Sequence, residues 1–345
     1  SYELLLFNPA WPTEWHLHMP LMAWHDYLQT GNAENLSAYY DDIKAKTLPP
    51  LAREDGLISS RTDKVDRELL ESIHFEGGNM RDIVDWPQGV PANEKAEEAS
   101  FGSERIAGET DRFVFSDYNT VVNAFHYRSL VLMTRIAAVL DKDEEKNFYA
   151  TRAEMVRSSI MDKLFDTERG IFTDGEDTDH ASLHANMFPL AFGIVPEDHV
   201  APVVDFIKSR GMACSVYGAQ YLLEGLYRVG EDEYALQLMT SEKKRSWMNM
   251  IRVGSTMTTE AWDEYYKPNL TWNHAWGAAP GNIIPRKLMG IEPLEPGFKR
   301  FSIHPQPGSL TNMQIVRPTI MGSVRCTLEA HPDRWSMELE VPGNT

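Results

Sequence analysis

The residues best suited to chemistry lie in one short segment, residues 254–280, with the sequence GSTMTTEAWDEYYKPNLTWNHAWGAAP. Glu260, Asp263 and His274 are interleaved there with three tryptophans and two tyrosines. A surface helix would instead collect its aromatic residues on one stripe and leave its acids on the opposite face. Carboxylates beside flat apolar rings suit a sugar-binding cleft, because rings stack on the apolar faces of sugars while acids move protons. We interpret the segment as half of a glycosidase active site.

Composition limits the classes of function. The chain has 345 residues, of which 42% are hydrophobic, so it can bury a sizeable core in one or two domains. Its 33 basic and 51 acidic residues give a net charge of −18, and no basic run is present. This balance argues against nucleic acid or an anionic membrane surface as a partner and favours a neutral substrate. No apolar run approaches the length of a membrane span.

Two cysteines and one acidic segment raise the question of bridges and metals. Cys214 and Cys326 lack the close Cys or His neighbours of a zinc site, so we expect two buried free thiols rather than a disulfide. Four acids at 174, 176, 177 and 179 could supply oxygens to calcium, but their spacing lacks the glycine and terminal glutamate of an EF-hand. We expect a solvated turn before a helix.

Helical periodicity dominates the first 290 residues. Apolar residues at helical spacing predict a helix over 118–140 and a second over 143–165, which together form a hairpin. Glycines near their ends support most of the other predicted helices, which cover 18–30, 34–48, 180–192, 198–209, 216–228, 231–240 and 272–289. Two long loops, 55–81 and 85–115, carry tryptophan and acids, and we expect them to be functional.

The composition changes after Gly290. Prolines and glycines are followed by alternating apolar and polar residues, which predict four or five strands, too few to close a sandwich alone. The sequence therefore predicts a helical domain over 1–290 and part of a β-sandwich over 291–345. Because the chain does not begin with Met and its first residues do not read as a signal peptide, we also expect it to be part of something longer.

Several segments carry a resemblance to a known family. They are WPTEWHLHMPLMAWHDYLQTGN, RDIVDWPQG, YNTVVNAFHY, SRGMACSVYGAQYLLEGLY and, above all, TTEAWD followed by NHAWGAAP. From about Pro9 to about Gly308, the chain resembles the catalytic domain of bacterial α-L-rhamnosidases, glycoside hydrolase family 78. The resemblance implies an (α/α)6 barrel, a six-hairpin toroid, followed by a C-terminal β-sandwich. Such a barrel has twelve helices, so the nine predicted here indicate that the barrel lacks its first helices.

The resemblance also implies an activity. It is the inverting hydrolysis of terminal α-L-rhamnosyl residues from glycans or rhamnosides, without a cofactor, in the periplasm or outside the cell. Inversion needs an acid and a base roughly 6.5–9.5 Å apart. Glu260 matches the general base of the family, whereas the family's general acid lies in a segment that precedes residue 1 of this chain. His274 matches a histidine that contacts a sugar hydroxyl, and Asp85 and Trp86 match an Asp-Trp pair.

Other candidate substrate-binding residues have ordinary structural alternatives. Trp15 and Trp86 could stack on the C5 methyl face of a deoxysugar, although large aromatic residues are buried anywhere. Trp262 is a predicted pocket residue, His274 could instead be a core residue, and Asp85 could cap a turn. Glu109 and Asp111 are expected to line the pocket, and Glu109 could alternatively replace the general acid.

Two other functions stay open from the sequence. The chain could bind carbohydrate without catalysis, or it could be a six-hairpin glycosidase that acts on another sugar, since fold does not fix function. A helical protein-interaction scaffold is disfavoured, because it would not need loops rich in acids and tryptophan.

Overall fold

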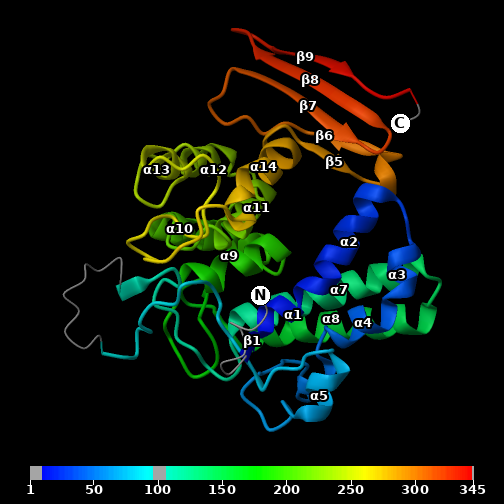
Figure 1. The fold of residues 1–345 in the computed structure, drawn as a ribbon, viewed down its shortest axis with the longest axis vertical. Helices are drawn as coiled ribbons and strands as arrows, with labels where there is room; N and C mark the ends of the chain where they lie inside the picture. Colours follow the sequence, from blue (N-terminus) through cyan, green and yellow to red (C-terminus); the bar gives the residue numbers. More distant parts are fainter. Residues whose placement is uncertain (1–9, 96–105, 344–345) are drawn as a thin grey trace. The chain divides into compact units, whose positions relative to one another are not determined.

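The computed structural model describes residues 10–95 and 106–343 (Figure 1). The chain forms two compact units. The first consists of Ser1–Trp24 and Ala33–Ala213, and the second of His25–Asn32 and Cys214–Thr345. Helix α2 (His18–Thr30) contributes residues to both units. Each unit is described below by itself.

A helical hairpin forms the core of the first unit. Helix α7 (Thr120–Val139) is mostly buried and begins at Asn119, whose side chain accepts the Val122 N–H at 2.9 Å. Helix α8 (Asp143–Lys163) packs against it (Figure 1). Three acids in the first turn of α8 and Lys163 in its last turn complement the helix dipole. The hairpin predicted over 118–165 is therefore confirmed.

The rest of the first unit is built from short elements around this hairpin. Strand β1 (Ala10–Pro12) pairs in parallel with β2 (Asn79–Arg81), with Pro12 opposite Arg81. The residues that follow the two strands are therefore neighbours. The other elements are α1 (Thr13–His16), α3 (Glu34–Ala38), α4 (Tyr40–Ala45), η2 (Pro49–Leu51), α5 (Arg67–Ser72), β3 (Phe165–Asp166), β4 (Ile171–Phe172), α9 (Leu183–Phe192), η3 (Glu197–His199) and α10 (Val200–Arg210).

The second unit combines helices with two antiparallel sheets. Its helices are α11 (Gly218–Arg228), α12 (Asp232–Met239), α13 (Trp247–Arg252), η4 (Ala275–Ala278), α14 (Ala279–Ile283), the π-helical turn η5 (Ile284–Leu288) and η6 (Pro296–Phe298). Strand β5 (Ile291–Pro293) pairs with β6 (Phe301–Ile303). Strands β7 (Asn312–Thr319), β8 (Gly322–Ala330) and β9 (Trp335–Glu340) form a meander with β8 in the middle (Figure 1). The strands predicted after Gly290 are confirmed.

Several element predictions need correction. The helix predicted over 34–48 divides into α3 and α4, and that predicted over 272–289 divides into η4, α14 and η5. The predicted loop 55–81 contains α5 and β2, and helix α13 was not predicted. Gly193 ends α9 with φ 75°, as expected of a helix stop.

The side chains settle two further expectations. Cys214 and Cys326 are free and buried, which confirms that prediction. The solvated turn predicted at 174–179 is wrong for its first residue. Asp174 is fully buried and accepts the backbone N–H groups of Val114 and Ser182 at 2.8 and 2.9 Å. The Asp174 carboxylate therefore joins its own segment to those of Val114 and Ser182.

Candidate active site

The first unit brings acids together where β1 and β2 end. Glu14, in α1, is 1% exposed, and its carboxyl oxygens accept the N–H groups of Ile83 at 3.3 Å and Val84 at 2.8 Å. Burial and the nearby carboxyl of Asp82 raise the pKa of Glu14 to about 8. Burial also raises the pKa of Asp82, whose Oδ2 accepts the Asn119 amide at 2.8 Å. The cluster therefore keeps at least one neutral carboxyl group near pH 7.

A tight turn follows Asp82. The Asp85 N–H donates to the Ile83 carbonyl oxygen at 2.5 Å, and Val84 between them has φ 61°. An i to i+2 bond around a central residue with positive φ is a strained γ-turn, and a β-branched residue rarely adopts this conformation. The turn connects the segment that follows β2 to Asp85 and Trp86.

Asp85 is fully buried and bound to a histidine. Its Oδ2 lies 2.8 Å from Nε2 of His184 in α9, and its Oδ1 accepts the Trp86 N–H at 2.9 Å. Trp86 itself is half-buried. Trp15 is also half-buried and packs edge to face against Trp11, with ring centroids 5.4 Å apart. Both predicted stacking tryptophans therefore keep exposed ring surface beside the acid cluster.

Residues 106–112 return alongside the segment that begins at Trp86. The Glu109 N–H donates to the Pro87 carbonyl oxygen at 2.9 Å, and the Gly89 N–H donates to the Thr110 hydroxyl at 3.0 Å. The backbones approach so closely that a Cβ on Gly89 would lie 2.0 Å from the Ala107 carbonyl oxygen. Glu109 is buried in this pairing. Residues 96–105 of the predicted functional loop lie outside the described residues.

Asp111 is held in an ion pair. It is buried, with φ 51°, and its Oδ2 accepts the Leu183 N–H at 2.7 Å and Arg210 Nε at 2.8 Å. A second bond joins its Oδ1 to Nη2 of Arg210. Asp111 thus connects the loop to the first residue of α9 and the last residue of α10. The predicted pocket residue has a structural role in addition to any contact with a ligand.

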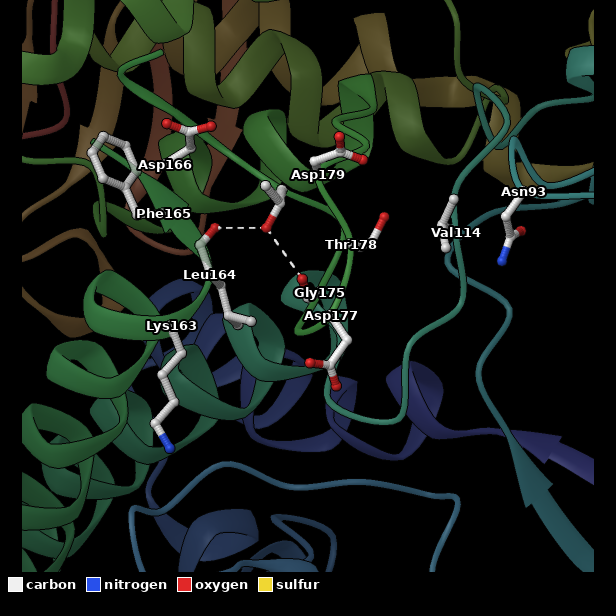
Figure 2. Close-up of a pocket in the computed structure, with 11 residues that line it drawn as sticks. Asn93, Val114, Lys163, Leu164, Phe165, Asp166, Gly175, Asp177, Thr178 and Asp179 are labelled. Carbon is white, nitrogen blue, oxygen red and sulfur yellow. Dashed lines mark hydrogen bonds between the residues drawn. The ribbon is translucent and has the colours of Figure 1, made fainter. Parts of the chain in front are cut away.

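An open pocket of about 710 Å³ in the first unit contains none of the predicted site residues. Asp166, Asp177, Asp179 and Lys163 line it (Figure 2). The Thr173 hydroxyl bridges two carbonyl oxygens in its wall, those of Leu164 at 3.3 Å and Gly175 at 3.2 Å (Figure 2). Among the described residues that line the pocket, Phe165 is the one aromatic ring, so the chemistry of this lining differs from that expected of a deoxysugar site.

The second unit holds the predicted base. Glu260 Oε2 accepts the Thr271 N–H at 2.9 Å and lies 3.2 Å from the Lys267 ammonium, while its own N–H donates to the Thr271 carbonyl oxygen. Burial alone would raise the pKa of Glu260, but the Thr271 N–H and Lys267 outweigh it and hold the pKa below its ordinary value. Glu260 is therefore ionised near neutral pH, as a general base must be.

His274 lies on the segment that faces Glu260. Its N–H donates to the Thr258 carbonyl oxygen at 2.8 Å, and the Thr258 hydroxyl donates to the His274 carbonyl oxygen at 2.9 Å. Its Nδ1 accepts the Trp276 N–H at 3.2 Å, and its ring packs on that of Trp276. With Nδ1 as an acceptor, Nε2 carries the proton of the neutral ring. The half-buried imidazole can donate a hydrogen bond to a ligand hydroxyl.

Trp262 lies in the core beside Glu260. It is 1% exposed, its indole N–H donates to the Cys214 carbonyl oxygen at 2.7 Å, and its ring packs edge to face against Trp247. Its contribution to a site is therefore to hold the 260–263 segment. Trp272, which follows Thr271 directly, is 42% exposed. Its exposed ring is accessible to a ligand, whereas nothing in the sequence distinguishes Trp272 from Trp262 and Trp276.

The predicted site residues fall into two groups. Trp15, Asp85, Trp86, Glu109 and Asp111 lie in the first unit, and Glu260, Trp262 and His274 lie in the second. Sequence reasoning missed the partners of these residues, which are His184, Arg210, Lys267 and Thr271. It also missed the two buried acids Glu14 and Asp82, which bind Val84 and Asn119. Glu14 and Asp82 stand in two of the segments that carry the resemblance, but nothing in either segment indicates that they meet.

Two family models match the chain. Residues 8–288 match the bacterial α-L-rhamnosidase six-hairpin glycosidase domain, and residues 290–345 match the bacterial α-L-rhamnosidase C-terminal domain. An α-L-rhamnosidase of Formosa agariphila is 25% identical over 99% of this chain and 34% of its own length. One from an Alteromonas species is 24% identical over 94% of this chain and 33% of its own length. The chain spans about a third of the length of these curated relatives.

Solved structures show the same fold. A family 78 rhamnosidase of Bacillus sp. GL1 covers 97% of this chain at 20% identity and a TM-score of 0.73, over 33% of its own chain. An α-L-rhamnosidase of Streptomyces avermitilis, solved with L-rhamnose, covers 94% at 18% identity and a TM-score of 0.69, over 28% of its own chain. The expected (α/α)6 architecture with a C-terminal β domain is confirmed. Among the described residues, no helix has the length and apolarity that crossing a membrane requires.

Proposed function

Because this chain belongs to the bacterial α-L-rhamnosidase six-hairpin glycosidase family, we propose that it hydrolyses terminal α-L-rhamnosyl residues with inversion at the anomeric carbon. The observation that carries the proposal is the state of Glu260. This acid sits in the T-T-E-A-W-D segment with its pKa held below the ordinary value by the Thr271 N–H and Lys267 against the opposing effect of burial. It is therefore ready to accept a proton from the attacking water.

The other predicted residues receive roles that match their contacts. His274 donates a hydrogen bond from Nε2 to a sugar hydroxyl, and Trp15 and Trp86 offer ring surface to the C5 methyl group. Asp85 is fully buried and bound to His184 and to the Trp86 N–H, so it supports Trp86 rather than touching the sugar. Trp262, being buried, supports Glu260 rather than touching the sugar. The reaction also needs a carboxylic acid that protonates the leaving group. The resemblance places that acid before residue 1, and Glu109 is the candidate substitute within this chain. The scheme includes no cofactor.

The proposal extends to the organisation and setting of the protein. We assign residues 1–290 to the catalytic barrel and 291–345 to part of the C-terminal β-sandwich. The substrate is a rhamnosylated glycan or glycoside, which would be met in the periplasm or outside the cell. The −18 net charge agrees with a neutral rather than a polyanionic substrate.

Hydrolysis of an aryl α-L-rhamnoside tests the activity and the base together. We expect Glu260→Gln to lower kcat by about 10²–10⁴-fold with an unchanged melting temperature, because the amide cannot accept the water proton. The exposed Glu264, four positions away, provides the matched control Glu264→Gln, which should leave kcat as it is. A folded protein that binds L-rhamnose without turnover would point to a carbohydrate-binding function, and turnover of other glycosides alone would point to another sugar.

A second comparison tests whether Glu109 donates the proton. Loss of a general acid harms substrates with poor leaving groups most, since an activated aryl group departs without protonation. Glu109→Gln should therefore slow an alkyl rhamnoside far more than a nitrophenyl rhamnoside if Glu109 is the acid. Equal effects on the two substrates would leave Glu109 as a pocket residue only.

A further inference from the structure

Two buried acids of the first unit have no part in the proposed chemistry. Glu14 and Asp82 are 1% and 8% exposed and interact electrostatically. The Glu14 carboxyl accepts hydrogen bonds from backbone N–H groups, whereas Asp82 accepts one from the Asn119 side chain at the start of α7. Burying two acids side by side is costly unless their contacts need them. The hydrogen bonds of Glu14 and Asp82 indicate a role in holding the backbone that leads to Asp85.

The side chain of Glu14 continues the hydrogen bonding between the β1 and β2 segments beyond the end of their ladder. The ladder ends at Pro12 and Arg81, and beyond it the carboxyl group of Glu14 takes the N–H groups of Ile83 and Val84 in place of a backbone acceptor. Those two residues are the first and the central residue of the γ-turn, in which Val84 has φ 61°. A strained turn persists only where its surroundings hold it. Here the holding group is Glu14, and Asp82 ties the same turn to the N-terminus of α7.

We propose that Glu14 and Asp82 are a positioning pair that holds the turn at Val84 and thereby places the buried Asp85 and, next to it, the ring of Trp86 that meets the substrate. The orientation toward substrate rests on the proposed function, whereas the hold on the turn does not. Neither acid touches the sugar. Their effect passes through the backbone of residues 82–86 to the His184-bound Asp85 and the half-buried Trp86.

The hold of the pair on the turn depends on one of the two carboxyl groups being protonated. The groups that face it are the carboxyls themselves, the Asn119 amide, the Thr13 and Ser60 side chains, and the half-exposed Arg61 guanidinium. Arg61 is the one cation among these partners of Asp82, and burial of the pair outweighs it. With the pKa of Glu14 near 8, the pair holds a proton at neutral pH and loses it in mild alkali. Two adjacent buried carboxylates would then repel each other and loosen the turn.

Amide hydrogen exchange tests the hold on the turn without reference to activity. Glu14→Ala removes both acceptors, so exchange of the Ile83 and Val84 amides should accelerate while exchange in α8 stays constant. Glu14→Gln keeps one carbonyl acceptor, so it should preserve the protection of one of these two amides. The exposed acid Glu68 gives the control Glu68→Gln, with no change expected. Unchanged exchange of Ile83 and Val84 in Glu14→Ala would overturn the proposal, whatever the protein hydrolyses.

Rhamnoside kinetics then test the orientation of Asp85 and Trp86. Misplaced binding groups cost about 10- to 100-fold in kcat/KM, and for Glu14→Ala we expect this loss as a rise in KM. A purely structural role would reduce the folded fraction and the apparent kcat but leave KM alone, and that result would also refute positioning. In the unsubstituted protein KM should rise above about pH 8, and in Glu14→Gln this rise should disappear.

The two sets of measurements separate the possible failures. If exchange responds to Glu14→Ala but no rhamnoside is hydrolysed, the proposed function fails and the hold on the turn stands. If hydrolysis occurs with the same KM in Glu14→Ala and the unsubstituted protein, the function stands and the positioning pair is wrong.

Discussion

At the scale of single residues, two glutamates illustrate how neighbours select a role. Glu14 is surrounded by buried groups and another acid, so its pKa is raised to about 8. Glu260 is also partly buried, but a backbone N–H and a lysine hold its pKa below the ordinary value. The same side chain is therefore a proton-retaining support in one unit and an ionised base in the other.

The ion pair at Glu260 leads to a pH prediction. Activity requires ionised Glu260, so the rate rises with pH through the pKa of that group and is complete above it. Lys267→Met removes a cation that lowers this pKa, and we expect the acidic limb of the kcat profile to move to higher pH. The exposed Lys243 supplies the control Lys243→Met, which should leave the limb in place. An unshifted limb in Lys267→Met would mean that another group controls it.

How much of the site could be predicted depends on how local its determinants are. Glu260 and His274 stand in one short segment rich in acids and tryptophan, and the sequence singles them out. Asp111 depends on Arg210, which lies 99 positions away, so its ion pair could not be read from spacing. Trp262 was predicted as a pocket residue from its neighbours, but an indole N–H bond to Cys214 holds it in the core. A short sequence pattern is thus enough to identify a reactive residue, but its burial and its partners depend on residues far away in the chain.

At the scale of elements, long helices were predictable and short or interrupted ones were not. Helices α7 and α8 each span five or more turns, and α8 buries Tyr149, Ala153, Val156 and Ile160 at helical spacing. Segment 272–289 contains Pro280 and Pro285, each at the start of a new helical piece, because proline cannot donate within a continuing helix. Helices α5 and α13 have six residues each, too few to show a period.

The N-cap of α7 offers a prediction at this scale. Asn119 accepts the Val122 N–H and also donates to Asp82. We expect loss of the cap in Asn119→Ala to lower the free energy of unfolding by about 1–2 kcal/mol. Loss of the hydrogen-bond donor to the buried Asp82 should add to this decrease. Asn119→Ser restores the cap acceptor but cannot reach Asp82 in the same way, so it should recover part of the loss. Urea unfolding of the two variants measures the difference, and equal losses would show that the cap contributes nothing.

At the scale of the whole molecule, the two units differ in their buried titratable groups. Three histidines with lowered pKa values, all caused first by burial, belong to the first unit: His16 at about 3, His18 at about 4 and His126 at about 3. The four histidines of the second unit, at 25, 274, 304 and 331, are instead exposed or half-buried. The acid response of the protein is therefore expected to be uneven along the chain.

The sign of that response follows from linkage. Each of these histidines is neutral in the folded state but takes up a proton near pH 6.5 when unfolded, so its stabilising contribution is complete above pH 6.5 and is lost as pH falls toward 4. Glu14 acts in the opposite sense, because its raised pKa makes the fold lose stability as pH rises from about 4.5 to about 8. Between pH 6.5 and 5 three histidines oppose two carboxyl groups with raised pKa values, Glu14 and Asp82, so acidification should destabilise the first unit.

Hydrogen exchange at pH 7 and pH 5, corrected for the intrinsic rate at each pH, can resolve this difference. We expect amides in α7 and α9 to lose protection at pH 5, while those in β7 and β8 of the second unit keep theirs. His126→Gln, which cannot take up a proton, should lose less stability between the two pH values than the unsubstituted protein. The exposed His304 in the second unit gives the control His304→Gln, with no change in this pH response. Equal loss of protection in both units would show that histidine burial does not govern the acid sensitivity of this fold, since the buried histidines lie in one unit alone.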